Sequence, residues 1–141
     1  MYRRRQRPLS IEVFNIHPNI RFNRNNLKKF IRDKLKELDV REEEINIVLT
    51  DDEYIRNLNK SYRGIDSPTD VLSFSMDENV LWGDIYISLD TAIKQAEEQG
   101  WDLDREVRFL AIHGLLHLLG YNDEDDEGYN TMMKLAEKLL I

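Results

Sequence analysis

The sequence predicts an α+β fold that forms one domain over residues 1–141. Two hydrophobic patterns alternate along the chain: short stretches in which every second residue is apolar, and longer ones in which apolar residues recur at intervals of three and four. The first pattern is typical of half-buried strands and the second of amphipathic helices. Taken in order they predict the succession βαβαββααα, which no repeat or linker interrupts. A chain of this length can bury about two-thirds of its unfolded surface, so we expect it to fold although it has no cysteine.

A strand and a helix are predicted first. Residues 9–13 alternate between apolar and polar side chains, and Pro18 stops this strand. From about Arg24 the apolar residues recur at helical spacing; they are Leu27, Phe30, Ile31, Leu35 and Leu38. This amphipathic helix is expected to pack on the strand.

The second strand, through residues 45–49, leads into a short helix. Thr50-x-x-Glu53 is a capping box that opens this helix, and Gly64 is expected to end it. The stripe predicted to be buried consists of Ile55, Leu58 and Tyr62.

A hairpin is predicted in the middle of the chain. Residues 66–70 read Asp-Ser-Pro-Thr-Asp, a turn signal, and residues 71–75 and 84–88 then have the pattern of two strands whose connection suits an antiparallel pair. Phe74 and Trp82 could stack on nucleobases, although filling the core or lining the hairpin is the more usual role.

Three helices are predicted to complete the chain. Ser88 is a plausible N-cap for the first, which Gly100 ends, and Asp102 or Asp104 caps the second. The third covers about residues 126–140. The middle helix is apolar on nearly all sides, so we expect it to lie centrally in the fold.

This central helix carries two of the three histidines in the chain, His113 and His117. Residues four apart lie on one face of a helix, so both imidazoles can reach a single ion. Gly120 then ends the helix, and its turn can bring Asp123 back toward the same point. Two imidazoles and a carboxylate suit Zn²⁺ or a similar divalent ion and leave a fourth position for water.

Two interpretations of the histidine pair are open. The imidazoles could be core side chains satisfied by hydrogen bonds, or they could be ligands. Burying two unpaired imidazoles among leucines costs free energy that coordination offsets, and the returning Asp123 supplies a third donor. Both observations favour a metal site. The remaining histidine, His17, precedes Pro18 and is expected to be a loop residue rather than a ligand.

The pattern His-x-x-x-His-x-x-Gly-x-x-Asp overlaps the signature of metzincin proteases. Those enzymes need a glutamate after the first histidine as general base, and this chain has Gly114 there. Peptide hydrolysis is therefore disfavoured. Cleavage of a phosphodiester depends less on such a general base, because a bound metal lowers the pKa of water toward ~7 and so supplies the nucleophile.

A basic face is predicted on the short helix that Gly64 ends. Arg56, Lys60 and Arg63 recur at intervals of four and three, which places them on one side. They could bind phosphates, although composition alone favours an ordinary solvated face.

Charge and composition limit the classes of function. A net charge of −7 argues against a protein that coats nucleic acid by bulk electrostatics, but it leaves room for a local basic patch. The arginines near Met1 are not followed by an apolar run, so neither a signal peptide nor a membrane span is expected. With 33% charged residues, a cytoplasmic protein is the expectation.

Two stretches carry a resemblance to a known family. Residues 113–121 read His-Gly-Leu-Leu-His-Leu-Leu-Gly-Tyr, and residues 62–75 read Tyr-Arg-Gly-Ile-Asp-Ser-Pro-Thr-Asp-Val-Leu-Ser-Phe-Ser, with Gly-Asp-Ile at 83–85. Both resemble the YbeY endoribonuclease family, whose signature is His-Gly-x-Leu-His-Leu-x-Gly-Tyr-Asp-His. There are two departures: Asn122 stands where the family has Asp, and Asp123 where it has a third His.

The resemblance implies a metal-dependent endoribonuclease that acts on single-stranded RNA. Ribosomal RNA 3′-end maturation and ribosome quality control would be its setting, with the small ribosomal subunit as partner. Arg63 would contact the substrate phosphate as a catalytic residue. The fold implied is a small mixed sheet of four strands surrounded by helices, metalloprotease (zincin)-like, with the histidine helix against the sheet. A non-catalytic ribosome-assembly module, whose ion only stabilises the Gly120 turn, stays open as an alternative.

Overall fold

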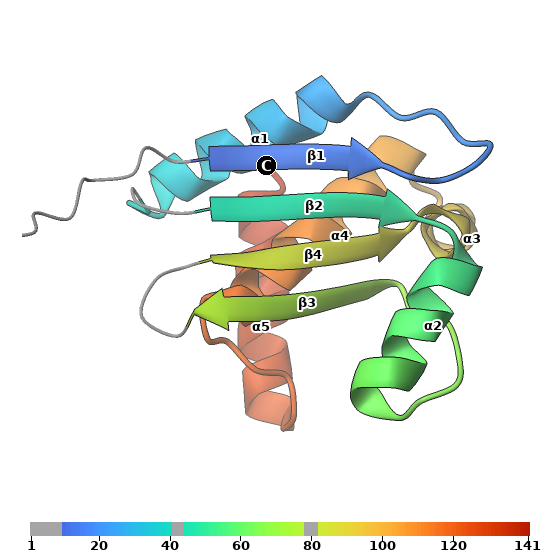
Figure 1. The fold of residues 1–141 in the computed structure, drawn as a ribbon. Helices are drawn as coiled ribbons and strands as arrows, with labels where there is room; N and C mark the ends of the chain where they lie inside the picture. Colours follow the sequence, from blue (N-terminus) through green and yellow to red (C-terminus); the bar gives the residue numbers. More distant parts are fainter. Residues whose placement is uncertain (1–9, 41–43, 78–81) are drawn as a thin grey trace, which may run out of the picture.

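The computed structural model describes residues 10–40, 44–77 and 82–141 and confirms the α+β fold (Figure 1). The elements follow the predicted order: β1 (Ser10–Asn15), α1 (Arg24–Glu37), β2 (Glu44–Thr50), α2 (Asp52–Arg63), β3 (Val71–Asp77), β4 (Trp82–Ser88), α3 (Leu89–Gln99), α4 (Leu103–Leu118) and α5 (Asp126–Leu139).

The four strands form one mixed sheet in the order β1-β2-β4-β3. β1 pairs parallel with β2, and β2 pairs parallel with β4, as expected for strands joined through helical crossovers. β3 and β4 form the predicted antiparallel hairpin. β3 is therefore one of the two edge strands of the described sheet, and it packs against α4 (Figure 1).

The helices divide between the two faces of the sheet. α1 and α4 cover one face of the sheet (Figure 1). On this face alternate residues of the strands are buried in one hydrophobic core. α2 lies toward the other face, where Tyr62, Phe74, Tyr86 and Tyr54 form a row of ring contacts with centroids 5.1 to 6.1 Å apart. α4 packs on β3, β4, α1, α3 and α5, so the histidine helix is central, as predicted.

Two glycines allow α4 to lie unusually close to the sheet. A Cβ atom added at Gly114 would meet the Ile85 Cγ2 atom at 2.7 Å and the Ser73 Oγ atom at 2.8 Å. One added at Gly83 would meet Leu118 Cδ2 and the Phe74 carbonyl oxygen, both at 2.7 Å. The Ser73 hydroxyl also donates a hydrogen bond of 2.9 Å to the Gly114 carbonyl. The backbone of α4 at Gly114 thus lies directly against side chains of β3 and β4, next to His113.

Replacing Gly114 with alanine should destabilise the protein although alanine favours helix formation. The helix gains about 1 kcal/mol in propensity, but overpacking a tight contact costs about 1–3 kcal/mol, and the Ser73 hydrogen bond is disturbed as well. We expect a net loss of about 1–2 kcal/mol in the free energy of unfolding, measured by urea denaturation. Asn57→Ala, at an exposed position within α2, is the matched control and should be neutral or slightly stabilising. Equal stability of Gly114→Ala and wild type would contradict the close packing.

Two predicted details differ in the structure, and a third cannot be compared. The N-cap of α2 is Asp51, whose carboxylate accepts from the Tyr54 amide at 2.8 Å, and not Thr50, whose hydroxyl donates to the Asp51 carbonyl. Tyr62 is 70% exposed rather than buried, because its ring lies against Phe74 at the rim of the sheet in a tilted contact. Asn59 takes the buried position instead. The side chain of Trp82 lies outside the described residues.

His17 is a loop residue, as expected, but it is well anchored. Its Nδ1 atom accepts from the Asn19 and Ile20 amides, so its Nε2–H donates to Asp90 at 2.8 Å. The Asp90 carboxylate in turn accepts from the Asp52 amide. This chain of hydrogen bonds fastens the loop after β1 to the starts of α2 and α3.

Glu106 is a buried carboxyl group in the first turns of α4. It is 3% exposed, and its Oε2 atom has no hydrogen-bond partner among the described residues. Burial raises the pKa of Glu106 above its ordinary 4.5, and the nearby Asp70 carboxylate raises it further.

The raised pKa makes stability depend on pH in a definite direction. The folded protein holds the Glu106 proton more tightly than the unfolded chain, so this contribution is fully present below about pH 4.5 and is lost as pH rises through the folded-state pKa. Glu106→Gln should therefore be more stable than wild type near neutral pH, and the difference should vanish below about pH 4.5. Urea unfolding of both proteins across this range measures it, with Glu97→Gln on the exposed side of α3 as control. A constant difference at all pH values would mean that Glu106 titrates normally.

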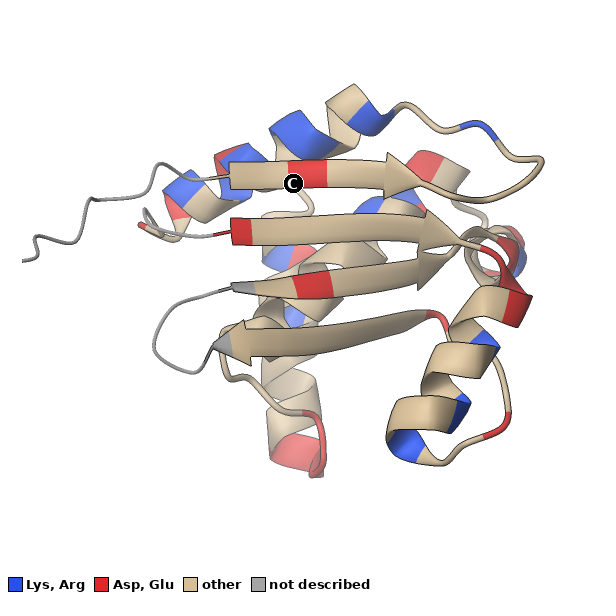
Figure 2. Ribbon diagram, viewed as in Figure 1, with Lys and Arg blue, Asp and Glu red and all other residues tan. Residues whose placement is uncertain are grey.

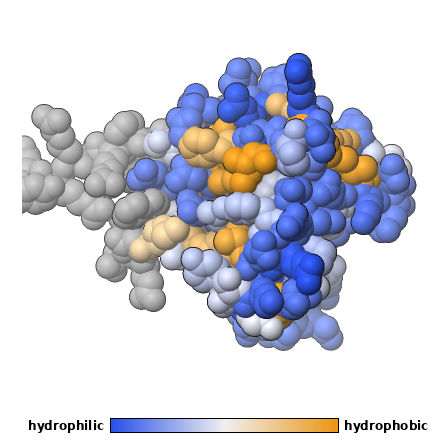
Figure 3. Space-filling model, turned by 45° about the vertical axis from the view of Figure 1, so that its right-hand side comes forward, coloured by the Kyte–Doolittle hydropathy of each residue, from blue (hydrophilic) through white to orange (hydrophobic). Residues whose placement is uncertain are grey.

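Charge and hydropathy are distributed unevenly over the surface. Lys and Arg gather on α1 and α2, whereas Asp and Glu mark the segment before α5 (Figure 2). The surface in Figure 3 is mostly hydrophilic, with separate apolar patches. Among the described helices, none combines the length and apolar character needed to cross a membrane.

Candidate metal centre

The end of α4 brings His113, His117 and Asp123 together. The two Nε2 atoms lie 3.1 Å apart, one helical turn from each other on the same face. After Leu119 the chain leaves the helix through Gly120, whose φ is +98°. The Tyr121 amide donates to the Leu116 carbonyl and the Gly120 amide to the His117 carbonyl, the paired bonds of a Schellman motif.

This turn returns the chain toward the histidines, as the sequence predicts. The Asp123 Oδ2 atom lies 3.6 Å from the Nε2 atom of His113 and 3.6 Å from that of His117. Ligands about 2.0–2.1 Å from a tetrahedral zinc ion stand about 3.3 Å apart. The three observed separations bracket this value, so the residues present fit one divalent ion. The group could hold a metal without rearrangement of the backbone.

The surroundings of His113 favour the neutral imidazole that coordination needs. Burial lowers the pKa of His113 below its ordinary value, and the adjacent His117 lowers it further. The carboxylates of Asp70 and Asp123 oppose this shift without reversing it. His113 therefore presents an unprotonated ring nitrogen at neutral pH.

A cavity of about 580 Å³ opens over the three donors. Arg63, from the end of α2, lines this cavity together with them. The outer strand β3 and the residue before it, from Asp70 to Phe74, form another part of the wall. The structure thus brings the predicted catalytic arginine and the predicted ligands around one space.

Arg56 and Lys60 stand apart from this cavity. Both are exposed on α2, and neither lines the space over the histidines. The Arg56 Nε–H donates to Asp66 at 2.7 Å across the loop after α2. This pair raises the pKa of Arg56 and lowers that of Asp66. Of the three basic residues on this face, only Arg63 opens onto the site.

Position 114 explains why the site lacks the peptidase base. Gly114 faces β3 and β4, and even a single added carbon atom would collide with Ile85 and Ser73. A glutamate there would have to enter the core between helix and sheet. The packing therefore agrees with the sequence in disfavouring peptide hydrolysis.

Two residues of the site were not predicted from the sequence. Asp70 begins the wall formed by β3 and acts electrostatically on His113, but the sequence predicts no role for it beyond ending a turn signal within the stretch that resembles the family. Asn122 lines the cavity beside Asp123 and accepts from the Glu124 amide at 3.1 Å. The sequence marks Asn122 as a departure from the family signature, but its place in the wall depends on the path of the turn after Gly120.

Fold and site together define a class: an α+β, metalloprotease-like domain whose central helix presents two histidines and whose following turn adds a carboxylate that could hold a metal ion. The family model for the endoribonuclease YbeY matches residues 12–141. The chain belongs to the endoribonuclease YbeY family.

Curated relatives with this name cover most of the chain. The endoribonuclease YbeY of Heliobacterium modesticaldum is 49% identical over 112 residues, 69% of this chain and 68% of the relative. That of Sulfurihydrogenibium sp. is 48% identical over 122 residues, 79% and 80% of the two chains. The solution structure of TM1509 from Thermotoga maritima has a TM-score of 0.65 and 28% identity, and covers 92% of this chain and 86% of that one.

Proposed function

We propose that this protein is a metal-dependent endoribonuclease that cleaves single-stranded RNA. The observation that carries the proposal is the shared cavity: Arg63 and the donor atoms of His113, His117 and Asp123 face one space. Membership of the endoribonuclease YbeY family supports the same reaction. The peptidase and the non-catalytic assembly module are not favoured.

The residues have distinct roles in this proposal. His113, His117 and Asp123 would hold Zn²⁺, which supplies a Lewis acid and a water of lowered pKa when bound. Arg63 binds the phosphate of the RNA through its planar guanidinium, whose paired donors match phosphate oxygens. The wall formed by β3 limits the approach of the strand to one side. Single-stranded substrates are proposed because the chain belongs to the endoribonuclease YbeY family.

The direct test is cleavage of one RNA in two forms. A single-stranded RNA with the sequence of the 3′ end of small-subunit ribosomal RNA should be cut by the zinc-loaded protein, and the same RNA annealed to its complement should resist. Casein serves as the peptidase substrate and should stay intact. Turnover of casein without RNA cleavage would replace the nuclease assignment with the peptidase one. Absence of both activities would leave the assembly module.

The biological setting follows from the family rather than from the geometry. We place the reaction in ribosomal RNA 3′-end maturation and ribosome quality control, with the small ribosomal subunit as partner. This setting is cytoplasmic. The acidic net charge supports a protein that docks through a local patch instead of coating RNA.

The basic residues of α2 outside the cavity should contribute to binding. Each contact with a single-strand phosphate gives a slope of about −0.7 in a plot of log affinity against log salt. We propose that Lys60 and Arg56 bind flanking phosphates, so Lys60→Ala and Arg56→Ala should each flatten the slope by about 0.7. Fluorescence anisotropy with labelled RNA measures it, and Lys138→Ala at the end of α5 is the control. An unchanged slope in both variants would return these residues to a solvated face.

A further inference from the structure

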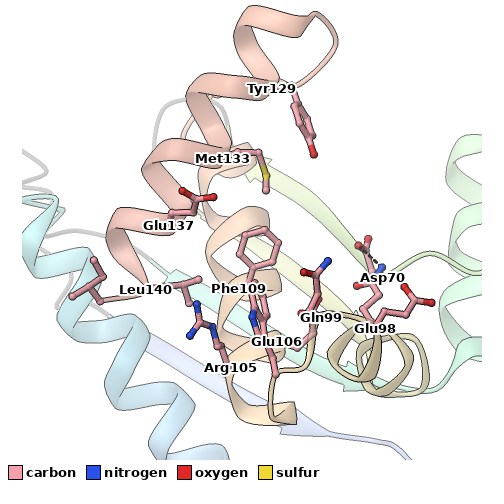
Figure 4. A pocket seen from close by; sticks show the side chains of 13 residues that line it. Asp70, Glu98, Gln99, Arg105, Glu106, Phe109, Tyr129, Met133, Glu137 and Leu140 are labelled. Atoms are coloured by element: carbon pink, nitrogen blue, oxygen red, sulfur yellow. Dashed lines mark hydrogen bonds between the residues drawn. The ribbon is translucent and has the colours of Figure 1, made fainter.

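A second cavity, of about 610 Å³, lies between α3, α4 and α5 (Figure 4). Phe109 of α4 and Tyr129 and Met133 of α5 form much of its apolar wall, and Glu106 and Gln99 contribute polar groups. Figure 4 shows these side chains around one space. The cavity is large enough for a nucleobase, and its function is not explained by the metal centre.

This cavity continues directly from the metal centre. Phe109 precedes His113 by one helical turn, and the centroids of their rings are 6.4 Å apart. Asp70 lines both cavities. Residues 109, 113 and 117 follow each other at intervals of four, so both cavities lie along one face of α4. A nucleotide whose phosphate lay beside Arg63 and the histidines would have a neighbouring cavity along the same helix face for its next base.

The charges that line the cavity disfavour phosphate and favour a ligand that donates hydrogen bonds. Four carboxyl groups line it, those of Asp70, Glu98, Glu106 and Glu137. The basic side chain in the lining, Arg105, has its guanidinium over the ring of Trp101, 4.4 Å from the centroid. Aromatic rings and carboxylate acceptors together are the means by which proteins recognise an unstacked base.

Glu106 supplies the observation that points to a ligand. Its side chain is almost fully buried at the edge of the cavity, yet its Oε2 atom has no partner among the described residues. A buried acceptor without a partner costs free energy, and such atoms are rare in native proteins, so a molecule that completes the hydrogen bond is one explanation for it. The exocyclic amino group of a base would provide that hydrogen bond.

We infer that this cavity receives the base next to the cleaved phosphate, and that Glu106 selects bases with an exocyclic amino group. The inference rests on the proposed endoribonuclease activity. Guanine, adenine and cytosine carry such a group, and uracil does not. Phe109 and Tyr129 would contact the faces of the base, and Glu106 would accept from its exocyclic amino group. Glu106 is thus a specificity-determining residue rather than a catalytic one.

Nucleosides test the cavity without involving phosphate or cleavage. Guanosine, adenosine, cytidine and uridine are titrated into the full-length zinc-loaded protein, and the indole N–H signal of Trp101 is followed by NMR. We expect the three amino-bearing nucleosides to shift this signal and uridine to bind at least about tenfold more weakly. Equal binding of all four nucleosides, or no shift at Trp101, would overturn the inference. So would binding of spermidine in place of the nucleosides, which would make this a site for cations.

Three variants connect the binding to named residues. Glu106→Gln should weaken the binding of the amino-bearing nucleosides about tenfold, because an amide can present a donor where the carboxylate accepts. The difference in affinity between these nucleosides and uridine should therefore become smaller. Tyr129→Ala, at an exposed position that tolerates truncation, should weaken the binding of all four nucleosides about tenfold. Glu97→Gln, on α3 outside the cavity, is the matched control and should change neither the affinity for nucleosides nor the preference among them. Unchanged nucleoside preference in a folded Glu106→Gln protein would remove Glu106 from base recognition.

Cleavage of RNAs that differ in one base separates this inference from the proposed function. The base beside the cleaved bond is varied in an otherwise constant strand, and rates are compared between wild type and Glu106→Gln. A wild-type preference for amino-bearing bases that falls about tenfold in the variant supports the inference. Cleavage by both proteins with identical preferences overturns the base pocket and leaves the nuclease intact. Absence of cleavage by wild type overturns the nuclease, whatever the nucleosides show.

Discussion

His117→Ala should lose both the bound metal and RNA cleavage. The imidazole is one of three donors around a single point, so its removal leaves two ligands and no closed site. Metal binding supplies several kcal/mol of transition-state stabilisation in such enzymes, which predicts a fall of about 1,000-fold or more in the single-turnover rate. Inductively coupled plasma mass spectrometry of the purified protein gives the metal content beside the kinetics.

The same variant separates metal loss from unfolding. A ligand present at about 1,000 times its dissociation constant stabilises the folded state by about 4 kcal/mol, so the metal-free protein should be less stable but still folded. His17→Gln is the histidine control, because His17 bonds to Asp90 away from the site; it should keep its metal. Asp123→His should preserve or tighten binding. A full metal content in His117→Ala would show that these residues are not the ligands.

Arg63→Ala should slow single-turnover cleavage by about 100-fold, beyond any effect on RNA binding. Arg63 faces the cavity that the three donors share, so its guanidinium can stabilise charge that develops on the phosphate. A 100-fold loss corresponds to about 3 kcal/mol of barrier. Rapid-quench measurements at saturating protein isolate this step from binding.

Replacing Arg63 with lysine separates the effect of its charge from the effect of its planar guanidinium group. Lysine keeps the charge but not the planar pair of donors, so Arg63→Lys should bind RNA nearly as well as wild type and still cleave slowly. Arg24→Ala, at the exposed start of α1, controls for loss of one positive charge and should cleave normally. If Arg63→Ala were to cleave at the wild-type rate once saturated, Arg63 would act in binding alone.

Local sequence patterns were sufficient for the order of elements and for the metal-binding candidates. The alternation in residues 9–13 and the three-and-four spacing after Arg24 report burial directly, because one face of each element meets the core. The histidine pair and Gly120 lie within one helix and its end, where short-range geometry determines which side chains meet. Asp123 follows Gly120 closely in the chain, so its place in the metal-binding group could be predicted from the same local geometry.

Features that depend on contacts between distant segments were not predicted from the sequence. Tyr62 fits a buried stripe by spacing, but ring contact with Phe74 holds it at the rim of the sheet. Arg56 reads as a free cation until the loop after α2 brings Asp66 to it. Glu106 resembles an ordinary acidic residue in a first helical turn, and only the packing of α3 and α5 against α4 buries it.

The lack of space behind Gly114 also has an evolutionary consequence. In the sequence, the single substitution Gly114→Glu would complete the His-Glu-x-x-His motif of zinc peptidases. In the folded chain it forces a charged side chain against Ile85 and Ser73, where even a methyl group is too close. A lineage with this packing would lose stability before it could gain a new activity. Selection for folding alone therefore keeps the descendants of such a protein from drifting toward peptide cleavage.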